Sequence, residues 1–190
     1  MPAMPDEVRT VGMISGNGIY PETFARAARK AGARLVVAAF HNETRPDLEE
    51  LVDGFRWFRV GQLNKMIRFF LEEGVGEAVM VGQISPRNLY ELRPDLRTIG
   101  ILARLKERNA ESLFGAVGEE REKDGSVLLS ATTFLEECLP GAGHVFGPKL
   151  SGRDLEDAAF GYRMAKETSR LDIGQSVVVR EGTVLAVEAF

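Results

Sequence analysis

Short apolar runs alternate along the first half of the chain with longer segments in which apolar side chains recur every three or four residues. The short runs predict buried strands, and the longer segments predict amphipathic helices. The predicted strands span residues 9–14, 34–40, 55–60 and 77–82, and the predicted helices between them span residues 22–31, 46–52 and 62–73. This alternation predicts an α/β fold built on a mostly parallel sheet, with helices on both faces.

The part of the chain after Pro94 is predicted to be mostly helical. Asp95 is placed to cap a helix N-terminus, because its carboxylate can accept hydrogen bonds from first-turn amides. The predicted elements are a helix at 96–108, a second at 110–123, a short strand at 126–130, and a small helix that Thr132 or Thr133 caps and Leu139 ends.

Residues 140–148 contain two prolines and three glycines, the sharpest change of composition in the chain. Such a stretch is typical of a linker or a domain boundary. We therefore expect an N-terminal domain at 9–139, a linker at 140–150, and the beginning of a second α/β domain at 151–190.

The predicted second part holds one helix and one hairpin. The helix spans 153–167, with Leu155, Ala158, Ala159, Tyr162 and Ala165 along its apolar face. The hairpin strands span 175–180 and 183–188 and turn at Glu181-Gly182. These elements are too few to bury a core of their own. We expect apolar hairpin side chains at an exposed edge, which leaves homodimerisation through that edge open.

The residues Gly16-Asn17-Gly18 join the first predicted strand to the first predicted helix. A glycine-rich turn at a helix N-terminus can present backbone N–H groups to a phosphate. The other interpretation is a tight turn that needs glycine only to reach positive φ. The spacing approaches a dinucleotide-binding fingerprint and makes the sheet Rossmann-like, but Pro21 stands where that fingerprint has a small residue. Glu43 also comes late for a ribose-binding acid, so a nicotinamide-dependent dehydrogenase is disfavoured.

Two further loops follow predicted strands at the same edge of the sheet. Lys65 lies early in one predicted helix, and Gly82 and Gln83 follow the next strand. Because ligands of open α/β sheets bind outside the carboxyl ends of the strands, we expect these loops and the Gly16-Asn17-Gly18 turn to converge on one pocket. Lys65 would then supply positive charge to a pyrophosphate, although a lysine in such a place is most often solvated.

Two carboxylates near the C-terminal hairpin are candidate metal ligands. Asp172 precedes the hairpin and Glu188 lies near its end, and oxygen donors of this kind are what Mg²⁺ prefers. The alternative is that both are surface residues, which is the commoner situation for such carboxylates. The sequence contains no Ser/His/Asp constellation, no Cys-x-x-Cys pair and no Walker-type lysine.

Composition and charge exclude several functional classes. A net charge of −4 and a pI near 5.4 indicate no general surface for nucleic acid. Cys138 is the only cysteine, so no internal disulfide can form, and its apolar neighbours predict a buried structural thiol. The chain shows no signal pattern and no apolar run long enough to span a membrane. We therefore expect a protein of the cytoplasm.

Four segments, taken in order, resemble one known family. They are Gly16-Asn17-Gly18-Ile19-Tyr20-Pro21, Gly61-Gln62-Leu63-Asn64-Lys65, Arg93-Pro94-Asp95, and a late block from Leu171-Asp172-Ile173-Gly174-Gln175-Ser176 through Val184-Leu185-Ala186-Val187-Glu188-Ala189. The resemblance extends from about Thr10 to Ala189, and the late block is its most specific part. The chain resembles the metal-dependent, two-domain LpxI family, the UDP-2,3-diacylglucosamine pyrophosphatases of the lipid A pathway.

The resemblance implies a hydrolase that cleaves the pyrophosphate bond of UDP-2,3-diacylglucosamine, giving 2,3-diacylglucosamine 1-phosphate and UMP. It implies Mg²⁺ as the cofactor, which would polarise phosphoryl oxygens and help to activate water. A cytoplasmic location fits, with peripheral association with the inner membrane left open. Substrate would lie between two domains, with Gly16, Asn17, Gly18 and Lys65 on one side, and Asp172, Gly174, Gln175 and Ser176 on the other.

The chain departs from the family pattern in two places. The family continues after Val-Glu-Ala with a Glu-Gly-Thr-Asp segment and most of a second domain, whereas this chain ends at Phe190. Most acids for metal binding and catalysis are expected in that continuation, so we expect a C-terminally truncated chain whose activity alone is doubtful. Gln83 also replaces a lysine common in the family, which weakens the case for positive charge at that loop. The alternative function is a non-catalytic module that binds a nucleotide or sugar nucleotide.

Overall fold

The computed structural model describes residues 8–85, 94–104, 127–143, 146–171 and 173–188. The chain divides into two compact units, Met1–Leu139 and Pro140–Phe190, and each is described by itself. The helix predicted at 110–123, the last residues of the one predicted at 96–108, and Asp172 lie outside the described residues. No helix of the described part is long and apolar enough to cross a membrane.

The first unit is built on a five-stranded sheet with the order β3-β2-β1-β4-β5. Its strands are β1 (Thr10–Ser15), β2 (Arg34–Phe40), β3 (Gly54–Phe58), β4 (Glu77–Val81) and β5 (Val127–Leu128). Every neighbouring pair is parallel, so the carboxyl ends of the strands share one edge of the sheet. The predicted α/β fold with a parallel sheet is confirmed.

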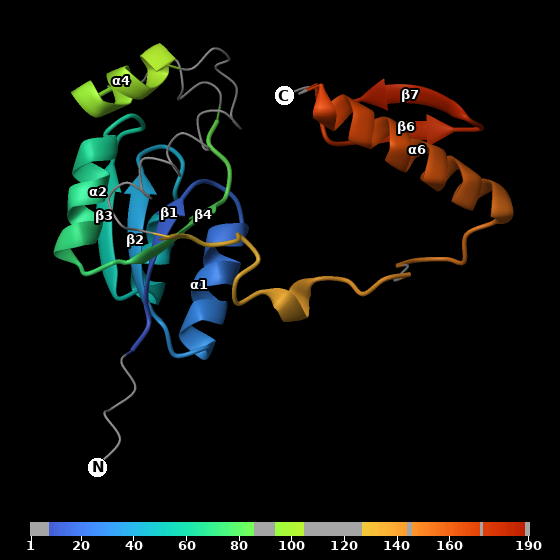
Figure 1. Cartoon of the computed structure of the whole chain (residues 1–190). Coiled ribbons are helices and arrows are strands. Elements are labelled where there is room, and N and C mark those ends of the chain that lie inside the picture. Colours follow the sequence, from blue (N-terminus) through green and yellow to red (C-terminus); the bar gives the residue numbers. More distant parts are fainter. Residues whose placement is uncertain (1–7, 86–93, 105–126, 144–145, 172, 189–190) are drawn as a thin grey trace. The chain divides into compact units, whose positions relative to one another are not determined.

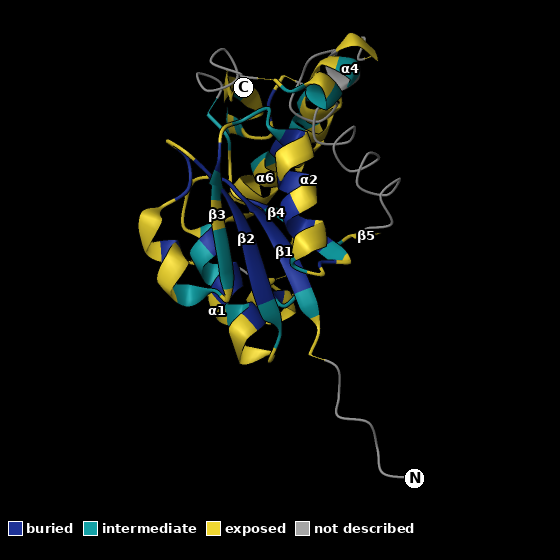
Figure 2. Cartoon of the chain, turned by 90° about the vertical axis from the view of Figure 1, so that its left-hand side faces the viewer, coloured by how far each residue is buried: buried dark blue, intermediate teal, exposed yellow. Residues whose placement is uncertain are grey.

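Helices cover both faces of this sheet (Figure 1). One face carries α1 (Tyr20–Lys30) and the 3₁₀ helix η1 (Pro46–Leu51). The opposite face carries α2 (Leu63–Glu72), and α4 (Leu96–Arg104) contacts α2. Strand β2 is buried from its second residue to its last, as Figure 2 shows in dark blue, because both of its faces are covered. Its continuous apolar run is what such a strand requires.

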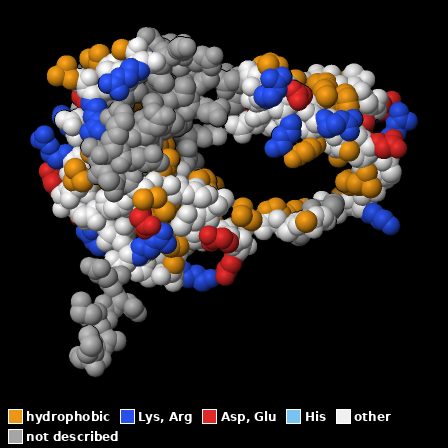
Figure 3. Space-filling model, in the orientation of Figure 1, with side chains coloured by type: hydrophobic (Ala, Val, Ile, Leu, Met, Phe, Trp, Pro, Cys, Tyr) orange, Lys and Arg blue, Asp and Glu red, His pale blue; other side chains and the backbone are white. Residues whose placement is uncertain are grey.

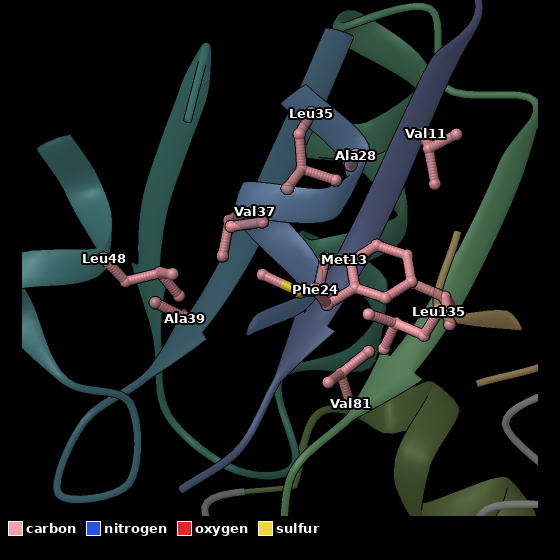
Figure 4. Close-up of a cluster of buried hydrophobic side chains, with 12 residues drawn as sticks. Val11, Met13, Phe24, Ala28, Leu35, Val37, Ala39, Leu48, Val81 and Leu135 are labelled. Atoms are coloured by element: carbon pink, nitrogen blue, oxygen red, sulfur yellow. The ribbon is translucent and has the colours of Figure 1, made fainter. Parts of the chain in front are cut away.

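Two aromatic side chains anchor the helices to the sheet. Phe24 of α1 is fully buried, with Met13, Val81 and Leu135 around it (Figure 4). Phe70 of α2 is fully buried on the other face, where it lies over Gly12. A Cβ at that glycine would come within 2.7 Å of Val75 Cγ1 and 3.1 Å of the Phe70 ring, so the missing side chain lets α2 approach β1 closely.

At the end of the first unit the predicted small helix is present and has Leu139 as its C-cap, but its predicted threonine cap and the predicted burial of Cys138 are wrong. The segment after Thr133 is a turn followed by the three-residue 3₁₀ helix η2 (Glu136–Cys138), and no side chain caps it. Cys138 is exposed rather than a buried structural thiol. The physical reason is that so short a helix turns few side chains inward, and Leu135, only 5% exposed, takes the core position.

An ion pair joins the amino ends of β1 and β4. Arg9 donates from Nε to Glu77 Oε2 at 2.6 Å and from Nη2 to Oε1 at 3.1 Å. The hydrogen bond from Arg9 is the main reason that the pKa of Glu77 is lowered. A carboxyl with a lowered folded-state pKa stabilises the fold above its unfolded pKa, and this stabilisation is lost as pH falls through the folded-state value.

We therefore expect Glu77→Gln to cost under about 1 kcal/mol of unfolding free energy at neutral pH, because both partners are partly exposed. Once the pH falls below the lowered folded-state pKa of Glu77, the wild-type carboxylate is protonated and the difference between the two proteins should vanish. Urea unfolding of both proteins across this pH range measures the effect. A difference that stays constant with pH would show that the ion pair contributes nothing.

The second unit consists of α6 (Gly152–Arg170) packed on the antiparallel hairpin of β6 (Val177–Arg180) and β7 (Thr183–Val187). Ser151 and Asp154 form a reciprocal capping box at the start of α6. The Asp157 carboxylate accepts hydrogen bonds from the Glu181 and Gly182 amides at 2.6 and 2.7 Å. This contact fixes the predicted hairpin turn to the helix, and the turn itself is confirmed.

The face of α6 that packs on the hairpin differs from the one predicted. Gly161 is buried, and a Cβ there would lie 3.2 Å from Val179 Cγ2, so this glycine sets the closest approach. Leu155 and Tyr162, expected on the inner face, are 54% and 65% exposed. Figure 3 shows hydrophobic side chains on the visible surface of this unit. The face predicted from the apolar stripe is wrong because Gly161, rather than the largest apolar side chains, lies where the helix and the hairpin meet.

Candidate functional site

The loops that follow β1 and β4 are joined to each other at the carboxyl edge of the sheet. Gly16 donates its amide to Val81 O at 2.8 Å. Asn17 N donates to Gln83 O at 2.7 Å, and Gln83 N donates back to Asn17 O at 3.2 Å, forming an isolated antiparallel bridge. The structure therefore brings together the predicted site residues of these two loops, at the kind of edge where open α/β sheets bind ligands.

Glycine is required in both loops for reasons of space and backbone conformation. A Cβ on Gly16 would lie 2.3 Å from the Gln83 carbonyl oxygen. Gly82 has φ +94°, and a Cβ there would lie 2.6 Å from Asn17 O. Gly18 has φ +100° with open space around it, so only its backbone conformation favours glycine. Two of the three glycines thus serve the contact between the loops.

The amides of the glycine turn already have acceptors within the protein. Those of Gly16 and Asn17 donate to β4 and its loop, and Gly18 N donates to Asn17 Oδ1 at 2.6 Å. First-turn amides of a helix have no acceptor within it, and Pro21 has no N–H to offer. A phosphate bound in this conformation would therefore meet the first-turn amides of α1, such as that of Glu22. The phosphate-facing interpretation of the turn stays a prediction.

A hollow of about 240 Å³, counting the open space at its mouth, lies beside the glycine turn. It is lined by Gly16, Gly18, Pro21, Glu22, Arg45, Asp47, Leu48 and Leu51. Arg45 is the cation here, and the sequence reasoning missed it. It donates through Nε to Asp47 Oδ1 at 3.1 Å and approaches Glu22 Oε2 at 3.4 Å. The hydrogen bond between the two side chains raises the pKa of Arg45 and lowers the pKa of Asp47.

Lys65 lies on the other side of the sheet from the glycine turn. It is exposed on α2, whereas the turn leads into α1 on the opposite face. Strand β2 separates β3, which precedes Lys65, from β1, so the two strands are about 10 Å apart. Lys65 shares the carboxyl edge with the turn but is not among the residues that line the hollow.

Asp95 caps two helices at once. Its Oδ1 accepts from Thr98 N at 2.9 Å, which confirms the predicted cap of α4. Its Oδ2 accepts from Asn64 N at 2.6 Å, in the first turn of α2. Thr98 Oγ1 also donates to Gly61 O at 2.7 Å. An internal carboxylate thus occupies the N-terminus of α2, the position beside Lys65 where an external anion would otherwise be favoured.

We expect Asp95→Ala to lower the unfolding free energy by about 2 kcal/mol, because two helix N-termini lose their acceptor together. Asp95→Asn keeps one side-chain oxygen and should lose about half as much. Urea unfolding of the three proteins gives the values. If Asp95→Ala changes the unfolding free energy by less than about 0.5 kcal/mol, the shared cap does not stabilise the fold.

The predicted site residues of the second unit lie close together, where the segment before β6 meets the end of β7. Gln175 N donates to Glu188 Oε2 at 3.3 Å, and Glu188 N donates to Ser176 O at 2.9 Å. Gly174 lies against the Glu188 backbone, where no Cβ would fit. The structure therefore groups Gly174, Gln175, Ser176 and Glu188, while Asp172 lies outside the described residues.

The described residues do not by themselves form the expected Mg²⁺ site. Nowhere among them do three or more His, Cys, Asp or Glu side chains come close enough to hold a metal ion. Glu188 offers a single exposed carboxylate, and one of its oxygens accepts a hydrogen bond from Gln175.

Two buried polar side chains lie above the end of β1: Glu43, which the sequence suggested only as a late and disfavoured ribose-binding acid, and Thr44, which it did not suggest. Thr44, 5% exposed, donates from Oγ1 to Ser15 O at 2.6 Å and accepts from Phe40 N at 2.9 Å. Glu43, 4% exposed, accepts from Ser85 N at 2.5 Å. An acid buried in this way is not placed to hold a ribose in an open crevice. In the sequence, the one sign of their role is that both residues closely follow a buried strand, at the edge where ligands of such sheets bind.

Comparison with known proteins decides the family. The LpxI N-terminal domain matches residues 10–138, and the LpxI C-terminal domain matches residues 141–190. The chain belongs to the LpxI family. One relative, the UDP-2,3-diacylglucosamine pyrophosphatase LpxI from Caulobacter vibrioides, is 28% identical to this chain over 185 residues, which cover 96% of this chain and 65% of that protein. The chain thus spans just under two thirds of the length of this relative.

Among solved structures, the biotin carboxylase subunit of a pyruvate carboxylase aligns with a TM-score of 0.39 at 15% identity, over 68% of this chain and 24% of that one. A complete pyruvate carboxylase from Rhizobium etli aligns with a TM-score of 0.41 at 12% identity, over 82% and 13%. Likenesses this weak carry no information about ligands.

Proposed function

We propose that this LpxI family chain binds UDP-2,3-diacylglucosamine and serves its hydrolysis to 2,3-diacylglucosamine 1-phosphate and UMP. The observation that carries the proposal is the match of both LpxI domains along the chain, together with a curated relative named as a UDP-2,3-diacylglucosamine pyrophosphatase. The lipid A pathway role follows from the same family. The chemical step is assigned here to the family's reaction and to no individual residue of this chain.

The geometry of the first unit supports a ligand at the carboxyl edge of its sheet. The loops after β1 and β4 meet there through the bridge between Asn17 and Gln83. The start of α1 borders the hollow next to them, and a helix N-terminus favours an anionic group such as a diphosphate. Arg45 lines the same hollow, where it is paired with Asp47 and Glu22. We assign the UDP portion of the substrate to this edge.

The cofactor of the proposed reaction is Mg²⁺, as the family resemblance implies. Mg²⁺ usually keeps several waters and is bound by one or two carboxylates together with substrate phosphates. Such a site needs no cluster of three protein ligands, so the lack of one among the described residues does not count against Mg²⁺. Glu188 and Asp172 stay the proposed protein ligands.

The alternative function is a module that binds a nucleotide or sugar nucleotide without hydrolysing it. The observation that favours it is that the glycine turn and the hollow beside it lie in the first unit, where they could bind a nucleotide whether or not hydrolysis follows. The two proposals share the ligand and differ only in turnover.

The test is an incubation of the purified chain with UDP-2,3-diacylglucosamine in detergent micelles, with Mg²⁺ or with excess EDTA, followed by quantification of UMP. The pyrophosphatase proposal predicts UMP that appears with Mg²⁺ and is suppressed by EDTA. Parallel calorimetric titration with UDP decides the alternative, which predicts saturable binding with no UMP. If neither UMP nor UDP binding is seen, both proposals fail.

A further inference from the structure

Glu43 connects two loops that are separate in sequence. It follows β2, and its Oε1 accepts the Ser85 amide at 2.5 Å in the loop after β4. Strand β1 lies between β2 and β4 in the sheet, so this hydrogen bond crosses over the end of β1. The Glu43 side chain therefore connects the strand ends on both sides of the glycine turn.

The segment that carries Glu43 is itself held firmly. The amides of Glu43 and Thr44 both donate to Phe40 O, at 3.2 and 3.0 Å, and close a tight turn after β2. Asn42 adopts φ +66° within this turn. Thr44 fastens the turn to the end of β1 through Ser15 O. Glu43 thus extends from a fixed base, and its carboxylate can hold the β4 loop in a defined place.

Burial makes a carboxylate a costly choice for a simple loop contact. Glu43 is 4% exposed, and removing a charged group from water is unfavourable unless it is well hydrogen-bonded. A hydrogen bond from an amide to a carboxylate is stronger and shorter than one to a neutral acceptor. This buried carboxylate lies at the carboxyl edge of the sheet, where it binds the loop that contains Gly82 and Gln83.

We propose that Glu43 is a positioning residue, whose buried carboxylate holds the Gly82–Ser85 loop where that loop contacts the UDP portion of the substrate. This inference rests on the proposed function for the identity of the ligand. Glu43 itself is too buried to touch the nucleotide and acts through the loop. Its role is therefore to fix the geometry of the edge before the ligand arrives, which lowers the ordering cost of binding.

The test compares the wild-type chain with Glu43→Ala, Glu43→Gln and Asp53→Ala. The first variant removes the acceptor of the Ser85 amide, and the second keeps an oxygen at the same place. Asp53→Ala is the matched control, because the Asp53 carboxylate accepts Leu35 N at 2.8 Å at the amino edge of the sheet. The readouts are amide hydrogen exchange at Ser85 and calorimetric titration with UDP.

For Glu43→Ala we expect Ser85 to exchange at least about tenfold faster and UDP to bind about tenfold more weakly, in line with the loss of one hydrogen bond to a charged group. Glu43→Gln should recover most of both. Asp53→Ala should leave UDP affinity within about twofold of wild type.

Unchanged Ser85 exchange or unchanged UDP affinity in Glu43→Ala would overturn the inference, and so would an equal loss of affinity in Asp53→Ala. A wild-type chain that neither binds UDP nor releases UMP defeats the proposed function separately. In that case the loop-holding role of Glu43 is supported or overturned by the exchange of Ser85 alone.

Discussion

Replacing Gly16 with alanine is expected to force apart the loops after β1 and β4. The new Cβ would lie 2.3 Å from Gln83 O and 2.8 Å from the Gln83 amide nitrogen. Both are backbone atoms, so no side-chain rotation can relieve the clash. The reciprocal hydrogen bonds between Asn17 and Gln83 would be lost as the loops separate. We expect a loss of about 2–4 kcal/mol in unfolding free energy and at least about a tenfold loss of UDP affinity.

Two other glycines provide matched controls for this variant. Gly18→Ala meets no atom within 4 Å and pays only for φ +100°, which costs about 1–2 kcal/mol. Gly76→Ala has open space and no positive φ, so it should be neutral or slightly stabilising. Urea unfolding and UDP titration of all three variants give the ranking. Equal effects for Gly16→Ala and Gly76→Ala would mean that the loops do not depend on their close contact.

Truncating Phe24 to alanine is expected to have the largest effect on stability in the first unit. The ring is fully buried between α1 and the sheet and meets the Phe134 ring edge-on, with centroids 5.7 Å apart. Removing it leaves a cavity lined by β1, β4 and the segment around Leu135. Phenylalanine-to-alanine changes in such cores cost about 3–5 kcal/mol.

Thermal and urea unfolding measure this loss, which corresponds to a drop of roughly 10 °C in Tm. Phe146→Ala makes the same chemical change at a side chain that is 82% exposed, and it should shift stability by less than about 0.5 kcal/mol. If the two variants lose similar amounts, α1 is not held to the sheet through Phe24.

The elements that could be predicted from the sequence are those whose burial repeats in a regular pattern. The continuous apolar run of β2 and the periodic positions of α2 each record which faces are covered, and both elements lie where the pattern places them. The prediction of the contact face of α6 from its apolar stripe was wrong, because the helix packs on the hairpin through Gly161, which an apolar pattern does not count. The prediction of a buried Cys138 was wrong for a related reason, because Leu135 fills the core position in this segment and Cys138 is left exposed.

The candidate site could be predicted only in outline. Strand ends and glycine turns are local signals, and they identified the loops after β1 and β4 correctly as neighbours of one edge. The bridge from Asn17 to Gln83 and the hydrogen bond from Ser85 to Glu43 depend on the strand order, which places β4 beside β1. Arg45 likewise becomes part of the site only through the position of η1 beside the glycine turn.

The central claim is that the carboxyl edge of the sheet, around the joined loops after β1 and β4, is where the nucleotide portion of the ligand binds. A titration of the isotope-labelled chain with UDP, followed through its backbone amide resonances, tests it most directly. We predict saturable shifts centred on the first-turn amide of Glu22 and on the adjoining amides of Gly18 and Gln83. Shifts confined to the amino edge, at residues such as Gly32 and Gly76, or no shifts at all, would contradict the account.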